Sequence, residues 1–511
     1  MKIEPLKAGR YLLVIDIVKE REFWLSLDKK YPIAAENYFK AYKRCDEKSG
    51  KTCWFIKGEE EINKLNLLVQ RTLKLNERCF NDQNICGFSA GDGYPQIWVR
   101  DNHTALKSAK YYYKEKFFEW IFYFLNHLDK NGLVYDWVDK EGKTDKNSVE
   151  SDQETLLSLG YFEILELNEK KYASYFTKIS NLLKRVWEAK KDEKSSLLTS
   201  AYTMDWGDVQ YANEDPIHLN ENSYIVTGAY ENFLFYKAVS KLIKISKELN
   251  IKDKNIEFFK KLKKTLKKEI LKNFWNPQKG FFISNRHITP VKTPFDEKNI
   301  FPMGSNAVSL STDIVDEEKF SSIVKTALFR QKLFNFSTIS GVLLPCYPKD
   351  FFSHPSVRDY FHYQNGGQWD WFGGMLLKEM FSKDKFFKEA FKALKEIASK
   401  NISNEGFYEW NDMIGRPKGA RNYTASAAAV TSAVIEGLFR IKTKKDKLYI
   451  KETPLKKDFL LNLQIPSLSK KLLYIQKNGT IRIKNFGFSK IVYISSSGKR
   501  IVITKEASFK K

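Results

Sequence analysis

The sequence predicts a mainly α-helical protein, a toroid of about twelve helices followed by a small β appendix at the C-terminus. Three observations predict this fold class. Apolar residues at helical spacing dominate residues 59–442, and long and short connections alternate between the helical stretches. After residue 442 the apolar period changes to two, which is typical of strands. Consecutive helical hairpins whose long loops share one rim would produce this alternation.

The helices are placed by the spacing of apolar residues and by polar residues at their starts. The predicted helices are residues 59–76, 100–113, 115–128, 150–166, 168–190, 221–247, 252–274, 304–311, 316–332, 367–381, 383–401 and 418–441. Several connections between them exceed ordinary loop length, for example residues 196–220 and 333–364. Because long loops on a helical scaffold commonly carry function, we expect the site in these loops.

The two ends of the chain differ from the helical barrel, predicted at residues 55–442. Residues 1–54 are an N-terminal segment of uncertain fold, in which Tyr11 to Val18 is strand-like and Ala34 to Arg44 is helical. This segment could extend the barrel, pair with the C-terminal strands or form a separate cap. Residues 443–511 are predicted to form β hairpins. Their turns are expected at Asn478-Gly479 and Ser497-Gly498, between alternating apolar runs.

Composition excludes several classes of protein. The 511 residues include 86 Lys and Arg against 62 Asp and Glu, for a net charge of +24. The lysines are spread along the helical stretches, as in residues 254–272, without base-reading motifs, so we expect no nucleic-acid partner. The apolar stretch from Tyr11 to Ile15 is too short for a signal peptide or a membrane span. We therefore expect a cytoplasmic protein with no membrane partner.

The five cysteines give a prediction about redox state. They are an odd number without metal-type spacing, which predicts reduced thiols instead of a disulfide framework. They are Cys45, Cys53, Cys79, Cys86 and Cys346.

Aromatic residues make up 15% of the chain, and many stand beside carboxylates in the loops. Examples are Asp136-Trp137, Asp205-Trp206, Trp369-Asp370 and Glu409-Trp410. Aromatic rings stack on the C–H faces of a sugar, and carboxylates hydrogen-bond to its hydroxyl groups. This composition favours a saccharide-binding site, with Trp98, Trp206, Trp369 and Trp410 as candidate stacking walls.

Two loop motifs contain candidate acid and base groups. Asp205-Trp206-Gly207-Asp208 offers two carboxylates, and the indole of Trp206 can raise the pKa of a neighbouring carboxyl group. The alternative for these aspartates is an Asx turn or a pair of helix caps. Glu409 lies between two aromatic residues in the loop before the last helix, where a carboxylate is either buried and partnered or catalytic. Together the motifs provide the two carboxyl groups that glycoside cleavage requires.

Three further polar clusters stand at expected helix starts. Arg100-Asp101 could grip adjacent sugar hydroxyls, or could form a cap and a salt bridge. Asp152 could likewise bind a hydroxyl, although helix capping by Ser151 or Asp152 is an equally simple interpretation. Gln364, in the segment Tyr363-Gln364-Asn365-Gly366-Gly367-Gln368-Trp369, is the last candidate hydroxyl ligand.

Other chemistries have little support in the sequence. The chain has no GxxxxGK[ST] phosphate loop, no GxSxG elbow and no HExxH motif. The six histidines are scattered without a metal-type spacing. We therefore expect neither a metal nor a cofactor.

These motifs, in the order WVRD, DWGD, YQNGGQWDW and GFYEWND followed by GRP and NYTASAAAV, resemble the (α/α)6-barrel glycosidases. That superfamily includes glucoamylases, trehalases, processing α-glucosidases and the glucosidase domain of glycogen debranching enzymes. Disaccharide phosphorylases share the barrel and have a DWND motif similar to DWGD. The resemblance covers roughly residues 55–442. Around the acid, the chain departs from the trehalase and processing-glucosidase signatures.

The resemblance implies a role for individual residues. The arginine and aspartate that bind the terminal sugar match Arg100 and Asp101. The general acid falls within residues 205–208, where a debranching-type Trp-x-Asp pattern favours Asp208 and a trehalase-like alignment favours Asp205. The general base matches Glu409.

We therefore expect an inverting glycoside hydrolase that removes a terminal, α-linked glucosyl or related hexosyl residue from a small saccharide. The acid and base carboxyl groups should lie about 6.5–9.5 Å apart. The main alternative is a disaccharide phosphorylase, for which the Arg416-Pro417-Lys418 run could bind phosphate. Others are a noncatalytic saccharide-binding protein, and a lyase or epimerase using His362 and Tyr363.

Overall fold

The structure is a computed structural model that describes residues 5–6, 10–11 and 45–510, apart from residues 151, 212–214 and 445. Residues 1–44 and residues 45–511 form two separate units. In the first unit, β1 (Pro5–Leu6) pairs antiparallel with β2 (Arg10–Tyr11). Apart from Tyr11, the strand expected up to Val18 lies outside the described residues, as does the helix expected from Ala34 to Arg44.

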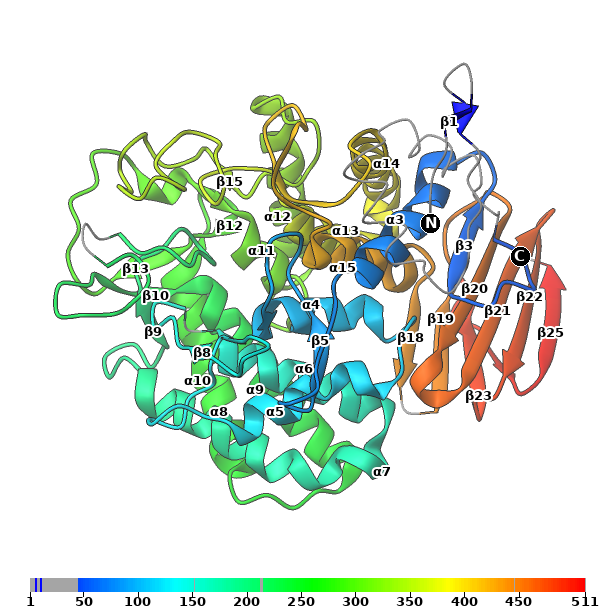
Figure 1. The fold of residues 1–511 in the computed structure, drawn as a ribbon, viewed down its shortest axis with the longest axis horizontal. Coiled ribbons are helices and arrows are strands. Elements are labelled where there is room, and N and C mark those ends of the chain that lie inside the picture. Colours follow the sequence, from blue (N-terminus) through cyan, green and yellow to red (C-terminus); the bar gives the residue numbers. More distant parts are fainter. Residues whose placement is uncertain are drawn as a thin grey trace. The chain divides into compact units, whose positions relative to one another are not determined.

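The helices of the second unit follow the predicted ranges closely (Figure 1). They are α3 (Glu60–Leu75), α4 (Val99–Ala109), α5 (Trp120–Asn126), α6 (Gln153–Leu167), α7 (Glu169–Tyr172), α8 (Phe176–Lys190), α9 (Ala229–Leu249), α10 (Ile256–Phe274), α11 (Met303–Ser309), α12 (Glu317–Leu333), α13 (Asp370–Phe381), α14 (Phe387–Ser403) and α15 (Thr424–Ser432). Short 3₁₀ turns are η2 (Glu115–Phe118), η3 (Ala173–Tyr175), η4 (Glu297–Asn299), η5 (Asp384–Phe386) and η7 (Pro466–Leu468), and η6 (Ala433–Leu438) is a π-helical turn.

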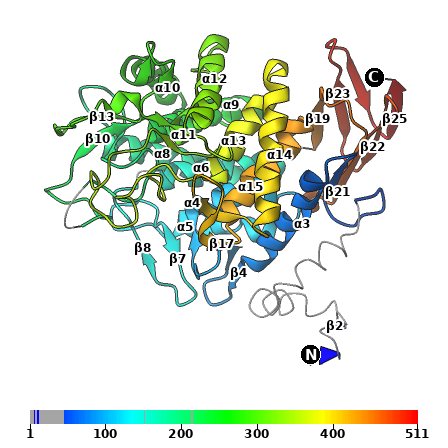
Figure 2. The same ribbon diagram turned by 90° about the horizontal axis from the view of Figure 1, so that it is seen from above.

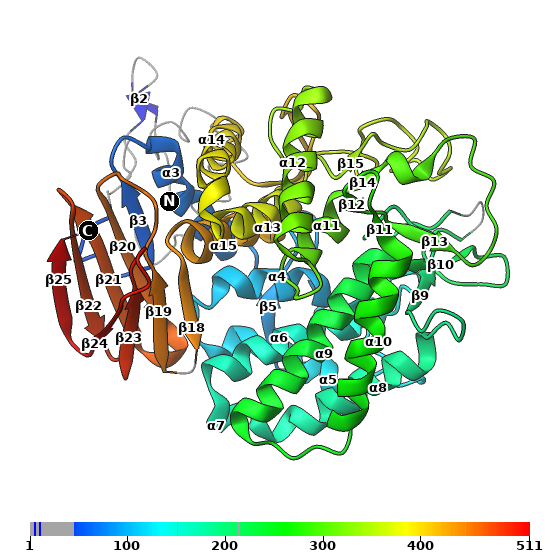
Figure 3. The same ribbon diagram turned by 180° about the vertical axis from the view of Figure 1, so that it is seen from behind.

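Six of these helices contact one another in a closed cycle, in the order α4, α6, α9, α11, α13, α15 and back to α4. Other helices pack outside them: α10 lies beside α9 (Figure 3), and α14 contacts both α13 and α3. Among the described residues, every helix is too short or too polar to span a bilayer. The cycle brings the first residues of helices that are distant in sequence into one region of the molecule.

Short strands lie in the connections between the helices. They are β4 (Glu77–Phe80), β5 (Ile85–Phe88), β6 (Ile97–Trp98), β7 (Trp137–Val138), β8 (Thr144–Asp145), β9 (Thr199–Ala201), β10 (Ile225–Gly228), β11 (Trp275–Asn276), β12 (Phe281–Phe282), β13 (Asn285–His287), β14 (Phe301–Pro302), β15 (Leu343–Leu344), β16 (Tyr408–Asn411) and β17 (Pro417–Arg421).

Several helix predictions were wrong in part: α4 ends at Ala109 and not at residue 113, α5 begins at Trp120 and not at residue 115, and three further differences have clear causes or forms. The helix predicted from residue 221 begins only at Ala229, because the β-branched run Ile225-Val226-Thr227 forms β10 between β9 and β13. The helix predicted at residues 168–190 is divided into α7, η3 and α8. The helix predicted from residue 418 begins at Thr424, because residues 417–421 pair with β16 in a hairpin.

Two sheets make up the strand-rich C-terminal part (Figure 2). The first has the order β25-β22-β21-β20-β3, with β3 (Cys53–Ile56), β20 (Phe459–Ile465), β21 (Lys470–Lys477), β22 (Thr480–Phe486) and β25 (Glu506–Lys510). The second has the order β18-β19-β23-β24, with β18 (Ile441–Lys444), β19 (Lys447–Lys451), β23 (Lys490–Ile494) and β24 (Arg500–Ile503).

The predicted hairpin turns are confirmed in these sheets. Lys477 is opposite Thr480, so Asn478 and Gly479 form a two-residue turn, and both have positive φ, as a type I′ turn requires. The second turn, with Gly498 at φ +83°, joins β23 to β24. On the other side of the first sheet, β3 pairs antiparallel with β20, and this strand spans the boundary predicted at residue 54. The division at residues 54 and 442 stays a prediction.

The prediction of reduced thiols was wrong for four of the five cysteines. Cys79 and Cys86 stand opposite each other on the hairpin of β4 and β5 and form a disulfide, and a second disulfide joins Cys45 to Cys53. The prediction considered only metal-type spacings, whereas a hairpin brings residues seven apart face to face. Cys346 is the free cysteine. Disulfides are typical of oxidising compartments, so the cytoplasmic location stays a prediction without support from the cysteines.

Candidate active site

Glu409 lies on β16, in the hairpin that precedes α15, and is 5% exposed. The hydroxyl groups of Tyr94 and Tyr363 donate hydrogen bonds to its Oε1, at 3.2 and 3.3 Å. The backbone N–H of Ala420 donates to Oε2 at 3.1 Å. Burial raises the pKa of Glu409 above its ordinary value and the negative charge of Asp208 adds to the rise, while the Ala420 hydrogen bond opposes it. Glu409 is therefore a desolvated carboxyl group whose orientation is fixed by three hydrogen bonds.

The hairpin is shaped so that its backbone approaches this carboxyl group. Gly419 has φ +67°, and a Cβ atom at this position would lie 2.6 Å from Glu409 Oε2. Glycine is thus required there both for the backbone angle and for the close approach. The pairing of β16 with β17 also shifts register between Tyr408 and Trp410, at the position of Glu409. Such irregularities re-aim a side chain out of the regular ladder.

Asp208 is half-buried in the loop that follows β9, and its Oδ1 accepts a hydrogen bond of 2.7 Å from Gln364 Nε2. Its negative charge contributes to raising the pKa of Glu409, Tyr94, Tyr363 and Glu150. These groups come from four different connections, so Asp208 faces the same region as Glu409. The acid and base candidates predicted from the sequence are thereby brought together.

Asp205 has different surroundings. It is 2% exposed, has φ +56°, and its carboxylate accepts a 3.0 Å hydrogen bond from the Ser305 backbone N–H and another from the Ser305 hydroxyl. Burial raises its pKa to about 6, opposed by the Ser305 and Gly304 hydrogen bonds. Because these bonds tie the carboxylate to the first turn of α11, whose N-cap residue is Pro302, Asp205 holds the loop in place through a contact between distant segments.

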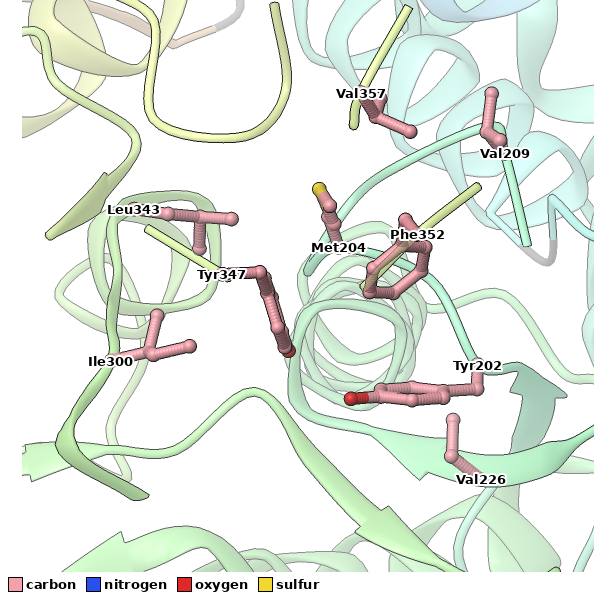
Figure 4. Close-up of a cluster of buried hydrophobic side chains, with 9 residues drawn as sticks. All are labelled: Tyr202, Met204, Val209, Val226, Ile300, Leu343, Tyr347, Phe352 and Val357. Carbon is pink, nitrogen blue, oxygen red and sulfur yellow. The ribbon is translucent and has the colours of Figure 1, made fainter. Parts of the chain in front are cut away.

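The loop that carries both aspartates is fixed by an apolar cluster and by one buried carboxylate. Tyr202, Met204 and Val209 pack with residues from the facing loops, namely Ile300, Leu343, Tyr347, Phe352 and Val357 (Figure 4). The hydroxyl groups of Tyr202 and Tyr347 both donate to Glu297 Oε1, at 2.8 and 2.7 Å, and His287 Nε2 lies 2.7 Å from Glu297 Oε2. Glu297 thus binds three side chains at once. No sequence motif pointed to this residue.

Arg100 and Asp101, at the start of α4, have different partners. Arg100 Nε and Nη2 donate to the two oxygens of Asp152 at 3.1 and 3.0 Å, and Nη1 lies 3.0 Å from Glu150 Oε1. The guanidinium group is therefore held by two carboxylates, as the salt-bridge interpretation expects. Asp152 occupies the N-cap position of α6 but makes no capping bond with its side chain, and Ser151 lies outside the described residues.

Asp101 has one carboxylate oxygen that makes no hydrogen bond within the described residues. Its Oδ1 is buried and has no hydrogen-bond partner in the described part of the chain, while Tyr423 donates to the carboxyl group. Burial raises the pKa of Asp101 to about 7, opposed by the Arg100 charge and assisted by the Glu409 charge. Gln364 Oε1 is likewise buried without a partner among the described residues. Unpaired buried acceptors are suited to binding ligand hydroxyl groups.

The four tryptophans predicted as stacking walls differ in burial. Trp206 and Trp369 are 3% and 1% exposed, and Trp206 packs edge-on against Trp369 with ring centroids 4.7 Å apart. Trp410 is also buried, with His362 at 4.6 Å. Their burial favours packing beneath the site over direct stacking. Trp98 is half-buried, and its ring lies 5.9 Å from that of Trp137.

Sequence reasoning did not assign roles to several residues of this site. Tyr94, Tyr423 and Glu150 stand within or beside the motifs that were singled out, but neither a tyrosine nor a second acid in such a motif shows which partner it faces. Their partners come from distant segments: Tyr94 and Glu409 are separated by 315 residues. In the described part of the chain, no group of three or more His, Cys, Asp or Glu residues could hold a metal ion.

Residues 95–335 match the family described as the bacterial α-L-rhamnosidase six-hairpin glycosidase domain. No curated protein matches the chain in sequence. Solved structures have the same fold at low sequence identity. The GH63 mannosylglycerate hydrolase from Thermus thermophilus, in complex with glucose, is 13% identical with a TM-score of 0.53, and the match covers 73% of this chain and 99% of that one.

Two other similar structures are longer than this chain. A GH78 family rhamnosidase of Bacillus sp. GL1 is 13% identical with a TM-score of 0.58, and the match covers 88% of this chain and 43% of that one. A putative kojibiose phosphorylase from the human microbiome is 12% identical with a TM-score of 0.50, covering 90% of this chain and 60% of that one. The resemblance to the (α/α)6-barrel glycosidase superfamily is confirmed: the chain has the glycoside hydrolase-like fold of that superfamily.

Proposed function

We propose that the protein is an inverting glycoside hydrolase that removes a terminal, α-linked hexosyl residue from a small saccharide. The observation that supports the proposal is that Asp208 and Glu409 come from separate loops and that the charge of Asp208 contributes to raising the pKa of Glu409. The six helices of the closed cycle and those packed outside them would form the (α/α)6 toroid that presents these loops at one rim. The rhamnosidase family match makes α-L-rhamnosides, alongside α-glucosides, the first substrates to test.

In this mechanism Asp208 is the general acid and Glu409 the general base. In its protonated form, Asp208 gives its proton to the glycosidic oxygen as the bond to the anomeric carbon breaks. A water molecule attacks that carbon from the opposite face, and Glu409 accepts its proton. The raised pKa of Glu409 makes it a stronger base, because the ideal pKa of a catalytic base lies near the working pH. The two carboxyl groups must leave room for the water, which requires about 6.5–9.5 Å between them.

The other residues of the site would orient the sugar and the acid. Gln364 fixes the rotamer of Asp208 through its Nε2 and leaves its Oε1 for a sugar hydroxyl. Asp101 offers its unpaired Oδ1 to another hydroxyl. Arg100, held by Glu150 and Asp152, supports this side of the site by its charge, and the half-buried Trp98 supplies an aromatic edge.

The surroundings of Glu409 favour a hydrolase over the phosphorylase alternative. A phosphorylase needs a phosphate-binding cluster of Arg, His or Ser/Thr side chains at this position, whereas Glu409 is a carboxylate that accepts hydrogen bonds from two tyrosines. Arg416 does not turn toward it: its Nε lies 2.5 Å from Asp412 Oδ2, and 70% of its side chain is exposed. The residues named for a lyase or epimerase are also engaged, since His362 Nδ1 bonds to the Ser356 carbonyl group.

The anomeric configuration of the first product tests the mechanism. Proton NMR during hydrolysis of an α-linked substrate should show the β-anomer before mutarotation, and Asp208→Asn should lose most of this activity. A product that retains the α configuration would contradict the proposal, because a retaining enzyme uses its second carboxylate as a nucleophile.

A further inference from the structure

A small cavity lies inside the cycle of helices, and neither Asp208 nor Glu409 lines it. Its volume is about 70 Å³, and its polar lining comes from α4, α9, α13, α15 and the residues that follow α11. The lining side chains that matter here are His103, Lys107, Lys237, Lys378, Glu379 and Ser432. On α4, Lys107 is two helical turns beyond Arg100, or about 10 Å along the axis. The cavity exceeds the roughly 10–15 Å³ that one water needs, so it can hold a group of several atoms.

Two of the three lysines that line the cavity form ion pairs with glutamates that do not line it. Lys107 forms an ion pair with Glu163, and Lys378 Nζ lies 2.6 Å from Glu436 Oε2. Both glutamates also bind Lys110, each at 2.6 Å, so these two carboxylates are shared by three ammonium groups. Glu379, whose charge also acts on Lys378, is a third carboxylate in this cluster.

Lys237 is the fourth lysine of this cluster and brings positive charge into excess over its three carboxylates. It lies in the middle of α9, so no helix end supplies it with carbonyl groups, and it makes no ion pair with any carboxylate of the described residues. Glu379 is the acidic side chain that lines the cavity, and it too forms no ion pair in the part of the chain that the structure describes. Burial, with the neighbouring charges of Lys107 and Lys378, lowers the pKa of Lys237 to about 7, and the negative charge of Glu379 opposes this shift. A buried ammonium group that makes no ion pair is destabilising.

Two other groups in the lining lack partners. Ser432 is 4% exposed, and its hydroxyl oxygen has no hydrogen-bond partner among the described residues. His103 Nδ1 is buried and equally unpartnered within the same described part of the chain. Native proteins pair such buried polar atoms, so each unpaired one calls for an explanation. Here an ammonium, a hydroxyl and an imidazole nitrogen on three helices line one enclosed space.

We propose that this cavity is a binding site for a small phosphate-class oxyanion, held by Lys237 with Ser432 and His103. An oxyanion would give Lys237 the direct ion pair that no carboxylate of the described residues provides, and it brings several acceptor oxygens for the surrounding donors. It can enter from the end where the side chains of Lys107 and Lys378 are 24% and 33% exposed. By tying α4, α9 and α15 together, the bound anion stabilises the folded state.

The test uses inorganic phosphate and the full-length protein. Thermal unfolding at constant ionic strength should show a saturable rise of Tm with phosphate but not with chloride, and calorimetry should give one site. Lys237→Met should weaken phosphate binding by about tenfold or more, as expected for one charge-assisted hydrogen bond. Without phosphate, the same variant should unfold at a higher temperature than the wild type, because a buried ammonium group that makes no ion pair is removed.

Matched variants separate this site from others. Lys241→Met, one turn further along α9, removes a lysine that is paired with Glu166 and should leave phosphate binding unchanged. Glu409→Gln should also leave it unchanged, which excludes binding in the candidate active site. If Lys237→Met does not fold, Ser432→Ala should show the weakened binding in its place. A wild type that does not respond to phosphate, or a Lys237→Met variant that binds it as tightly, would overturn the proposal.

Discussion

Gln364 donates a hydrogen bond of 2.7 Å from its Nε2 to Oδ1 of Asp208, across 156 residues of sequence. This contact joins the loop after β9 to the loop before α13, and it fixes the direction in which the Asp208 carboxyl group points. The remaining Gln364 Oε1 is buried and unpaired within the described residues. Gln364 is thus placed to orient both the proposed acid and a sugar.

Gln364→Leu should therefore reduce kcat by about tenfold to a hundredfold, because misplacing a catalytic group by about 1 Å has an effect of this size. The Tm should change little, since the substitution removes an amide whose acceptor oxygen is unpaired. Steady-state kinetics on the best substrate of the panel check this prediction. A change in KM alone would assign Gln364 to sugar binding only.

Tyr363→Phe should shift the acidic limb of the pH profile of kcat/KM upward. The hydroxyl group stabilises the ionised form of Glu409, so removing it raises the pKa of this carboxyl group further. One neutral hydrogen bond corresponds to roughly half a pH unit to one unit. Tyr94→Phe removes the second hydroxyl and should shift the limb in the same direction. A downward shift would contradict Glu409 as the base.

Asp101→Asn should stabilise the protein above neutral pH while lowering its activity. Burial raises the pKa of Asp101 to about 7 from an ordinary value of 3.8, so the folded state binds this proton more tightly than the unfolded state. Stability from this group is present below about pH 4 and is lost as the pH rises to about 7. The variant should gain a few kcal/mol at pH 8 and less at pH 5, at about 1.4 kcal/mol per pKa unit. Urea unfolding at both pH values measures the difference.

Glu297→Ala should lower the Tm and the kcat together. It leaves the hydroxyl groups of Tyr202 and Tyr347 and the ring of His287 without their shared acceptor, at a cost of about 2–4 kcal/mol. Glu297→Gln keeps an acceptor oxygen and should recover part of both losses. An unchanged kcat in the alanine variant would show that this anchor does not position the loop of Asp208.

Thiol titration tests the two disulfides. The denatured protein should have one reactive thiol, from Cys346, before reduction and five after it. Five thiols without reductant would restore the prediction of reduced cysteines that the sequence suggested.

The helices and the C-terminal hairpins could be predicted because each depends on local patterns. Periodic apolar residues placed α10 and α12, and Asn478-Gly479 placed a turn, without knowledge of distant partners. The order of the loops likewise led to the prediction that Asp208 and Glu409 serve one site, and the charge of Asp208 does contribute to raising the pKa of Glu409. In contrast, β10 overrides a helical pattern because its strand partners lie elsewhere in the chain.

Contacts between distant segments could not be predicted. The choice between Asp205 and Asp208 depends on Ser305, which binds Asp205, and on Gln364, which binds Asp208. Neither partner is near the motif in sequence. For the same reason, the sequence did not predict the role of Glu297 or the buried position of Lys237. Both depend on neighbours from distant segments, which only the three-dimensional structure shows.

The most direct test of the proposed function is sugar release from α-linked rhamnosides, glucosides and other hexosides, with and without inorganic phosphate, by the wild type and by Glu409→Gln. We predict that the wild type releases a reducing sugar without phosphate, and that Glu409→Gln loses this activity by about 10²–10⁴-fold. Sugar release that requires phosphate and persists in Glu409→Gln would contradict both the proposed hydrolase activity and the role of Glu409 as its general base.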